Sequence, residues 1–289
     1  MNKNRYWILF LTVLLSVYSA CAHTMEKESM KTVIEKALEH ANSQSLILAK
    51  NVAALSGRLP KSIKEGKLET SLSDWWCSGF FPGTLWYLYE YSNDKEIGKY
   101  ATLLTERIKK EQYNKNTHDL GFMLYCSYGN ALRLTGRKIY KSILINGAKS
   151  LSTRYNPVVG CIRSWDFNKD KWQYPVIIDN MMNLEYLMWA YKETGDERFK
   201  AISVNHANKT MENQFRTDYS CYHVISYSPE TGRVMVKGTH QGYSDESAWS
   251  RGQAWALYGY SMMYRETKNE KYLVQAKCIA DFILNHPRL

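Results

Sequence analysis

Two aspartates occupy positions where a carboxyl group could do acid–base chemistry. Asp179 follows the apolar run 176–178 and precedes residues that recur at helical spacing, so it should lie at or just before a helix start. Apolar surroundings raise the pKa of a carboxyl group, whereas a helix N-terminus lowers it. A carboxyl group tuned in this way suits general acid–base catalysis. The alternative is that Asp179 only caps the helix, because Asp is a favoured N-cap residue.

Asp119 occupies the same kind of position, at the start of another apolar helix. A simple N-cap is again the alternative interpretation. If both helices surround a common funnel, their first residues bring two carboxylates to one face. Such a pair is the arrangement that glycoside chemistry uses.

A third cluster combines an arginine with two tryptophans. Arg251 lies between Trp249 and Trp255 where a helix is expected to begin. This combination suits a planar anionic sugar, because the guanidinium binds a carboxylate and the indoles take the sugar faces. The alternative is a structural arginine paired with Asp245 or Glu246.

Other classes of site leave little trace in this chain. The formal net charge of +10 is spread along the sequence, without the long basic run that indicates a nucleic-acid arm. Such a charge is compatible with a general attraction to polyanions, acidic glycans among them. There is no G-x-S-x-G, phosphate-binding glycine loop or His/Cys metal cluster. The cysteines that follow the N-terminal segment are widely spaced and predict neither a zinc site nor a dense disulfide framework: Cys77, Cys126, Cys161, Cys221 and Cys278.

Four helical hairpins should position these residues. In each, an apolar helix ends in a short polar turn and an amphipathic helix follows, the unit of an αα-hairpin. Helices that are apolar all round are buried, and one-sided helices cover them, so repeated pairs predict a helical toroid or solenoid. The expected pairs are 85–91 with 95–112, 119–134 with 138–153, 180–193 with 197–215, and 249–266 with 270–285.

The remaining segments are a first helix and the connections. Residues 31–56 read as a helix and residues 57–74 as a polar loop. The linkers 154–178 and 216–248 are long, and long loops on a rigid scaffold commonly carry sites. A small β-hairpin is expected near 221–237, and His223 lies in its first strand. A lone histidine is more often structural than catalytic.

Residues 1–22 read as a signal peptide, with a basic start and a short apolar run. Cleavage before Cys21 would leave a lipidated N-terminal cysteine, and cleavage after Ala22 would give a soluble protein; the first is favoured. We therefore expect an exported cell-envelope protein, either periplasmic or a lipoprotein anchored through Cys21. Residues 23–289 form the predicted hairpin domain.

Several strings in the chain resemble glycoside hydrolase family 88, the unsaturated glucuronyl hydrolases. The similarity runs from about residue 30 to the end and is weaker to family 105, the unsaturated rhamnogalacturonyl hydrolases. The strings are WWCSGFFPGTLWYLYEYS, HDLGFMLYCSYGNALRLTG, VIIDNMMNLEYLMWA, YHVISYSPETG and GTHQGYSDESAWSRGQAWALYGY.

The resemblance implies an all-α (α/α)6 toroid and a specific reaction. Such enzymes remove the non-reducing-end 4,5-unsaturated uronic acid from lyase-generated acidic oligosaccharides, by hydrating the C4=C5 bond. It implies that Asp179 is the acid/base and Asp119 its partner, without a metal or organic cofactor. The residues that would hold the sugar are Trp75 or Trp76, with His223, Gln241, Trp249, Arg251 and Trp255.

One departure from the family pattern concerns length. The expected helices fall about three short of a closed toroid, and a segment whose serines contact the substrate in the family is missing, which predicts a C-terminally incomplete domain. Two other functions remain open: an unsaturated rhamnogalacturonyl hydrolase, and a non-catalytic glycan-binding lipoprotein. The sequence leaves the oligomeric state and the glycan preference undetermined.

Overall fold

The computed structural model describes residues 29–287, so the predicted signal peptide and Cys21 lie outside the described residues. The chain divides into two compact units, Met1–Gln44 and Ser45–Leu289. The helix α2 (Met30–Ala53) begins in the first unit and ends in the second. The second unit contains all the residues that the sequence singles out for chemistry.

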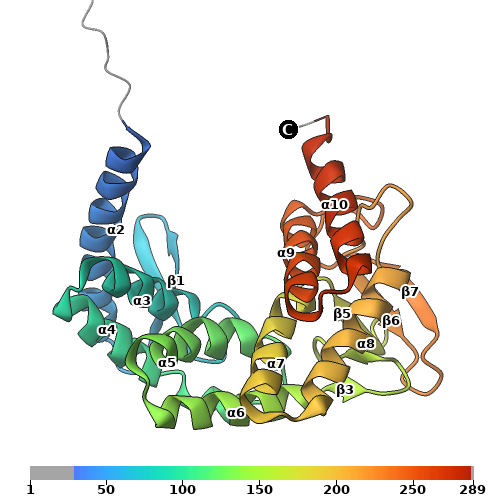
Figure 1. The fold of residues 1–289 in the computed structure, drawn as a ribbon, viewed down its shortest axis with the longest axis horizontal. Helices are drawn as coiled ribbons and strands as arrows, with labels where there is room; N and C mark the ends of the chain where they lie inside the picture. Colours follow the sequence, from blue (N-terminus) through green and yellow to red (C-terminus); the bar gives the residue numbers. More distant parts are fainter. Residues whose placement is uncertain (1–28, 288–289) are drawn as a thin grey trace, which may run out of the picture. The chain divides into compact units, whose positions relative to one another are not determined.

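The predicted hairpins are confirmed (Figure 1). The first helices of consecutive hairpins pack against one another, α3 on η2, η2 on α7 and α7 on α9, while each second helix packs on its own first helix. The pairs are α3 (Phe80–Ser92) with α4 (Lys95–Glu106), η2 (Gly121–Gly129) and α5 (Asn130–Thr135) with α6 (Lys138–Ser152), α7 (Asn180–Thr194) with α8 (Glu197–Asn213), and α9 (Ser250–Thr267) with α10 (Glu270–Leu284).

The same backbone device turns the chain in all four hairpins. The residue after each first helix adopts a left-handed conformation, and its N–H donates to the carbonyl four residues earlier at 2.8 Å. This closure satisfies a carbonyl that the helix end would leave unpaired. The residues are Asn93, Gly136, Gly195 and Lys268. In three hairpins a side chain at the next position then caps the second helix: Asp94, Asp196 and Asn269.

The inner segment of the second hairpin differs from the predicted helix over 119–134. Residues Gly121–Gly129 form a π-helix, η2, before the chain continues as α5. Gly121 packs closely on α7, because a Cβ at this position would lie 2.5 Å from Asn183 Oδ1. Asn183 Oδ1 also accepts the N–H of Phe122 at 3.2 Å. This packing ties the start of η2 to α7.

The predicted β-hairpin near 221–237 is confirmed, and a third strand extends it into a three-stranded sheet. The two expected strands are β6 (Val224–Tyr227) and β7 (Val234–Gly238), and β5 (Tyr174–Ile177) pairs with β6 in an antiparallel register. β5 lies in a stretch that the sequence assigned to a linker. Its four residues are all buried, so it lacks the alternation that marks a half-exposed strand.

Other predicted loops also contain regular structure. The stretch 57–74 holds the hairpin β1 (Leu59–Lys64) and β2 (Lys67–Ser71), so the prediction of a polar loop was wrong. Glu65 and Gly66, between these strands, both have positive φ, the backbone that a tight hairpin turn requires. Two short strands, β3 (Tyr155–Asn156) and β4 (Cys161–Ile162), follow α6, and the 3₁₀-helix η1 (Lys109–Tyr113) precedes η2.

The largest buried side chains on the inner helices of the second unit pack against the second helices of the hairpins. Trp86, Tyr186, Leu187 and Tyr260 are almost fully buried on the inner helices. Within residues 29–287, no helix has the length and apolar character needed to span a bilayer.

Candidate active site

A cavity of about 500 Å³ lies where the first residues of η2, α7 and α9 meet the sheet. Five of the residues singled out in the sequence line it: Trp76, Asp119, Asp179, Gln241 and Arg251. The two aspartates, which lie sixty positions apart in the sequence, therefore share one cavity.

Asp179 sits between the end of β5 and the start of α7. Its residue is only 5% exposed, and its carboxylate makes no capping hydrogen bond, so the simple N-cap interpretation does not hold. Burial raises the pKa of Asp179 to about 7, and the negative charge of Asp119 acts in the same direction. The positive charges of His118 and Arg251 oppose this rise. Asp179 can therefore carry a proton near neutral pH.

The sheet register brings His223 to Asp179. Ile177, the last residue of β5, pairs with Val224, the first residue of β6. The N–H of Ile178 then donates to the carbonyl of His223 at 3.1 Å. Asp179 follows Ile177 by two residues, and His223 directly precedes Val224. The pairing therefore brings His223 Nε2 to 3.7 Å from Asp179 Oδ2. Neither of these two atoms has a hydrogen-bond partner within the described residues.

The loop after β7 determines which nitrogen of His223 carries the proton. Nδ1 accepts the backbone N–H of His240 at 2.9 Å and that of Gln241 at 3.2 Å. A nitrogen that accepts these donors has no proton of its own, so the neutral ring carries its proton on Nε2. Burial, with the positive charges nearby, lowers the pKa of His223 to about 3. His223 therefore presents a neutral N–H towards Asp179.

Asp119 has the opposite electrostatic character. Thr117 Oγ1 donates to its Oδ2 at 2.6 Å, and His118 Nε2 lies 3.2 Å from its Oδ1. Burial alone would raise the pKa of Asp119, but the charge and hydrogen bond of His118, the hydrogen bond of Thr117 and the charge of Arg154 together hold it below its ordinary value. The pair thus combines an ionised Asp119 with a protonatable Asp179, as general acid chemistry needs.

Arg251 lies over tryptophan rings at the cavity wall. Its guanidinium carbon lies 4.3 Å from the ring centroid of Trp249, 5.1 Å from that of Trp255 and 5.6 Å from that of Trp76. Nη2 donates to Gln241 Oε1 at 2.9 Å. In the described part of the chain Arg251 forms no ion pair with Asp245 or Glu246, so the structural alternative is wrong.

The predicted sugar-binding residues fall into two groups. Trp76 and Gln241 line the cavity with Arg251, whereas His223, Trp249 and Trp255 stand behind this lining: Trp249 packs on the His223 ring at 4.7 Å and Trp255 packs on Trp76 at 6.1 Å. Trp75 does not line the cavity. It is 38% exposed, and Lys61 Nζ lies 4.9 Å from its ring centroid.

The sequence interpretation missed a second wall of the cavity. Trp165 and Phe167 stack at 5.1 Å with an interplanar angle of 11°, and the ring of His240 lies 5.3 Å from Trp165. Asp166 and His118 also line the cavity. A run of aromatic and charged residues in the long linker 154–178 was the available signal, but only the fold shows which of them face the aspartates.

Metal ligands and disulfides complete the inventory of reactive groups. Between residues 29 and 287, no group of three or more His, Cys, Asp or Glu side chains is arranged to hold a metal ion. The cysteines at positions 77, 126, 161, 221 and 278 are free.

The comparison with known proteins agrees with this geometry. Glycosyl Hydrolase Family 88 matches residues 51–268, a span that contains both aspartates, His223 and Arg251. The chain belongs to this family. It thereby also belongs to the (α/α)6 fold class that the family resemblance implied, in agreement with the hairpin repeat.

Characterised relatives include enzymes that act on unsaturated uronides. The chain is 50% identical over 215 residues to an unsaturated glucuronyl hydrolase of Formosa agariphila, covering 74% of this chain and 54% of that protein. It is 36% identical over 213 residues to an unsaturated chondroitin disaccharide hydrolase of Streptococcus agalactiae, covering 73% and 54%. The chain thus spans about half the length of the curated relatives it matches.

Solved structures give the same assignment. The crystal structure of an unsaturated glucuronyl hydrolase specific for heparin has a TM-score of 0.81 and 51% identity, over 86% of this chain and 68% of that one. That of an unsaturated glucuronyl hydrolase from Bacillus sp. GL1, responsible for the degradation of glycosaminoglycan, has a TM-score of 0.78 and 30% identity, over 86% and 68%.

Proposed function

We propose that this protein is a glycosidase that removes the 4,5-unsaturated uronic acid from the non-reducing end of acidic oligosaccharides. The observation that carries the proposal is the Asp179 carboxyl group, which is buried, protonatable near neutral pH and faces the neutral Nε2–H of His223. An ionised second carboxylate, Asp119, shares its cavity.

The first step uses the protonated form of Asp179. The C4=C5 bond of the unsaturated uronide is an enol ether, so its electrons can take the Asp179 proton at C4 and leave a positive charge shared between C5 and the ring oxygen. The charge of Asp119 favours this cation electrostatically. Once Asp179 has lost its proton, the Nε2–H of His223 faces the new carboxylate.

The second step adds water. Water attacks C5 and gives its proton back to Asp179, so the carboxyl group is regenerated and the sum of both steps is hydration of the double bond. The product is a hemiketal at C5. It opens to a ketone, the hemiacetal thereby exposed at C1 collapses to an aldehyde, and the remaining sugar leaves as an alcohol.

Arg251 is placed to hold the uronate in this reaction. The substrate carboxylate is attached to C5, next to the bond that is hydrated, and a guanidinium binds such a group through two parallel hydrogen bonds. Trp249, Trp255 and Trp76 hold the guanidinium in place. The charge of Arg251 lowers the pKa of Asp179 in the free protein. A bound substrate carboxylate would neutralise that charge, which favours the protonated form of Asp179.

We propose oligosaccharides that polysaccharide lyases release from glycosaminoglycans as the substrate class. The names of the relatives support this choice, because they specify heparin, chondroitin disaccharides and glycosaminoglycan. The net charge of +10 favours such anionic ligands.

The test follows the ultraviolet absorbance of the conjugated double bond in lyase-generated heparin and chondroitin disaccharides. Wild type and Asp179→Asn are compared, because the amide keeps the size of the side chain but has no acidic proton to give. We expect the absorbance to decay with wild type only. Turnover of an unsaturated uronide on rhamnose alone would favour a rhamnogalacturonyl hydrolase, and binding that is equal in both variants without turnover would favour a glycan-binding protein.

We further propose that the protein is exported, on the sequence of residues 1–22. Mass spectrometry of the mature N-terminus in a bacterial host tests this. A lipidated Cys21 would support a membrane anchor, and a chain that begins after Ala22 would support a soluble envelope protein. A chain that still carries residues 1–20 would contradict export by either route.

A further inference from the structure

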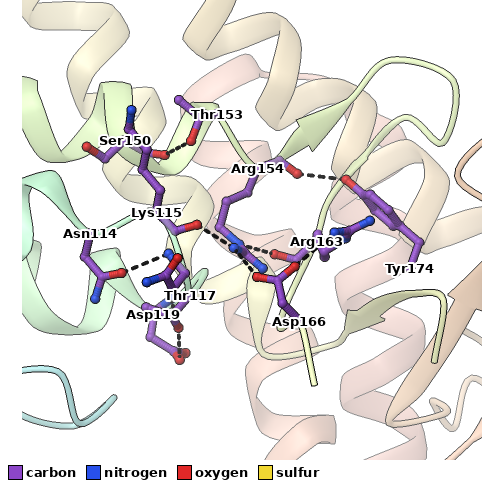
Figure 2. Close-up of polar contacts among 11 residues, drawn as sticks. Asn114, Lys115, Thr117, Asp119, Ser150, Thr153, Arg154, Arg163, Asp166 and Tyr174 are labelled. Carbon is purple, nitrogen blue, oxygen red and sulfur yellow. Dashed lines mark hydrogen bonds and ion pairs between the residues drawn. The ribbon is translucent and has the colours of Figure 1, made fainter. Parts of the chain in front are cut away.

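The stretch that carries Asp119 has its own internal bonds (Figure 2). Asn114 Oδ1 accepts the N–H of Asn116 at 2.9 Å, and Thr117 Oγ1 accepts the N–H of Asp119 at 3.1 Å. These bonds connect neighbours in the sequence. They determine the local shape of the stretch 114–119 but not its position relative to the other walls of the cavity.

A buried arginine connects this stretch to the rest of the unit. Arg154 follows α6, its side chain is only 5% exposed, and its Nη1 donates to the carbonyl of Lys115 at 2.5 Å. The same nitrogen lies 2.8 Å from Asp166 Oδ2, and Nε donates to the carbonyl of Arg163 at 2.8 Å. Figure 2 shows the guanidinium between the stretch 114–119 and the segment that holds Asp166.

The partners of Arg154 belong to two walls of the active-site cavity. Asp119 lines it on one side, and Asp166 lines it beside the stacked rings of Trp165 and Phe167. Arg154 itself does not line that cavity; it lines a neighbouring one of about 430 Å³, whose wall also includes Lys115 and Asp166. Its guanidinium therefore joins two cavity walls from behind.

The main chain of Arg154 is anchored as well. Its carbonyl accepts the hydroxyl of Tyr174, the first residue of β5, at 2.8 Å. β5 leads directly to Asp179. Arg154 thus contacts the segments that carry both aspartates, and its rigid five-donor fork suits a side chain that must bind several acceptors at fixed angles.

We propose that Arg154 is a positioning residue for the active site, which holds Asp119 and Asp166 at a fixed separation across the cavity. The proposal rests on the proposed function for its kinetic consequence, but its structural part stands independently of turnover. Arg154 does not line the active-site cavity, so it acts through the Lys115 carbonyl and the Asp166 carboxylate.

The pKa of Asp119 is a measurable quantity that reports on the charge of Arg154 and not only on its packing. The charge of Arg154 contributes to the lowered pKa of Asp119. The other groups that face Asp119 are His118 and Thr117 on its own stretch, Asp179 at the start of α7, and Cys77, whose thiol pKa rises mainly through burial and also through the Asp119 charge. Removal of Arg154 should raise the pKa of Asp119.

The matched control is Arg163→Met. Arg163 Nη1 pairs with the same carboxylate, Asp166 Oδ1, at 2.9 Å, and its guanidinium lies over the ring of Tyr174. Its side chain donates no hydrogen bond to Lys115 in the described residues. Arg154→Met and Arg163→Met therefore each remove one ion pair of Asp166, but only the first releases the stretch that carries Asp119.

The experiment measures the full chain by carboxyl ¹³C NMR, with the Asp119 signal assigned by its loss in Asp119→Asn. We expect a higher pKa of Asp119 in Arg154→Met than in wild type and in Arg163→Met. With lyase-generated disaccharides, kcat should fall on the order of 100-fold in Arg154→Met, as for a displaced catalytic group, with a smaller change in KM. Arg154→Lys keeps the positive charge but lacks the guanidinium fork. The Asp119 pKa in this variant should therefore lie close to its wild-type value, while kcat stays well below that of wild type.

Circular dichroism and thermal melting show whether each variant is folded. If Arg154→Met is not folded, Arg154→Gln, which also removes the charge, takes its place. An Asp119 pKa that is the same in both arginine variants would overturn the proposal. A wild-type chain that turns over no unsaturated uronide would contradict the proposed function instead, while the NMR comparison would still decide the role of Arg154.

Discussion

Asp179 Oδ2 and His223 Nε2 face each other at 3.7 Å, and the opposite side of the histidine ring is held by two backbone N–H groups. Because those donors bind Nδ1, His223 is a neutral donor towards Asp179 and not a second acid. The proton of the site therefore belongs to the carboxyl group, whose pKa burial raises to about 7.

Replacement of Asp179 by asparagine should abolish the proposed hydration while leaving the fold intact. A general acid contributes typically 10²- to 10⁴-fold in rate, so kcat should fall by about that factor. The measurement is the initial rate of absorbance loss at saturating disaccharide. Residual activity above a tenth of wild type would contradict the assignment of Asp179 as the proton donor.

The same substitution should stabilise the protein at alkaline pH. Between about pH 4 and pH 7 the folded protein keeps a proton on Asp179 that the unfolded chain has released, so the free energy of unfolding falls as pH rises through this window. The full loss is at most about 4 kcal/mol, from roughly 1.4 kcal/mol for each pH unit. In urea unfolding, the free energy of unfolding of Asp179→Asn should therefore exceed that of wild type at pH 8, and this difference should shrink towards pH 4.

The pH dependence of kcat/KM should be set by the two carboxyl groups. Activity should decline above about pH 7, where Asp179 loses its proton, and the acid limb should lie below the ordinary range of an aspartate because the pKa of Asp119 is lowered. His223 should contribute no inflection near its ordinary value, because its pKa lies near 3. ¹⁵N NMR of His223 should show the neutral Nε2–H form from pH 5 to pH 8, and a doubly protonated ring at pH 5 would contradict this.

Arg251→Lys should weaken substrate binding more than it slows the chemical step. A lysine keeps the charge but loses the planar fork that binds a carboxylate and lies over the rings of Trp249 and Trp255. A hydrogen bond to a charged group contributes about 1.5–3 kcal/mol, so KM should rise by roughly 10-fold or more. Arg216→Lys is the control, since Arg216 pairs with Glu246 outside the cavity; an equal rise in KM would argue against the role of Arg251.

Gly121→Ala should destabilise the inner helices. The added Cβ would lie 2.5 Å from Asn183 Oδ1 and 3.0 Å from its Cα, so η2 and α7 must separate, at a cost of about 1–3 kcal/mol. Gly129→Ala, in the same π-helix, meets only the ring of Tyr125 at 2.9 Å and should cost less. Chemical denaturation of both variants gives the comparison, and equal stability would show that the contact with Asn183 relaxes freely.

Much of the architecture could be predicted from the sequence because it depends on near neighbours. The four hairpins follow from apolar periodicity and from turn residues such as Gly136 and Gly195, which adopt the left-handed conformation that ends a helix. Asp119 and Arg251 stood out because each is a charged residue beside apolar or aromatic side chains where a helix was expected to begin. The β1–β2 hairpin and β5 were not predicted, because neither shows the alternation of apolar and polar residues by which short strands are recognised.

By itself, the sequence determined the hairpin repeat, the two aspartates at helix starts and the arginine among tryptophans. Only the tertiary structure decided how they work together. The pairing of Ile177 with Val224 brings His223 to Asp179, and Arg154 connects Lys115 to Asp166, all between segments far apart in the chain. The physical reason is that helix and turn preferences are local, whereas a pKa depends on burial and on charges that only the folded chain brings near.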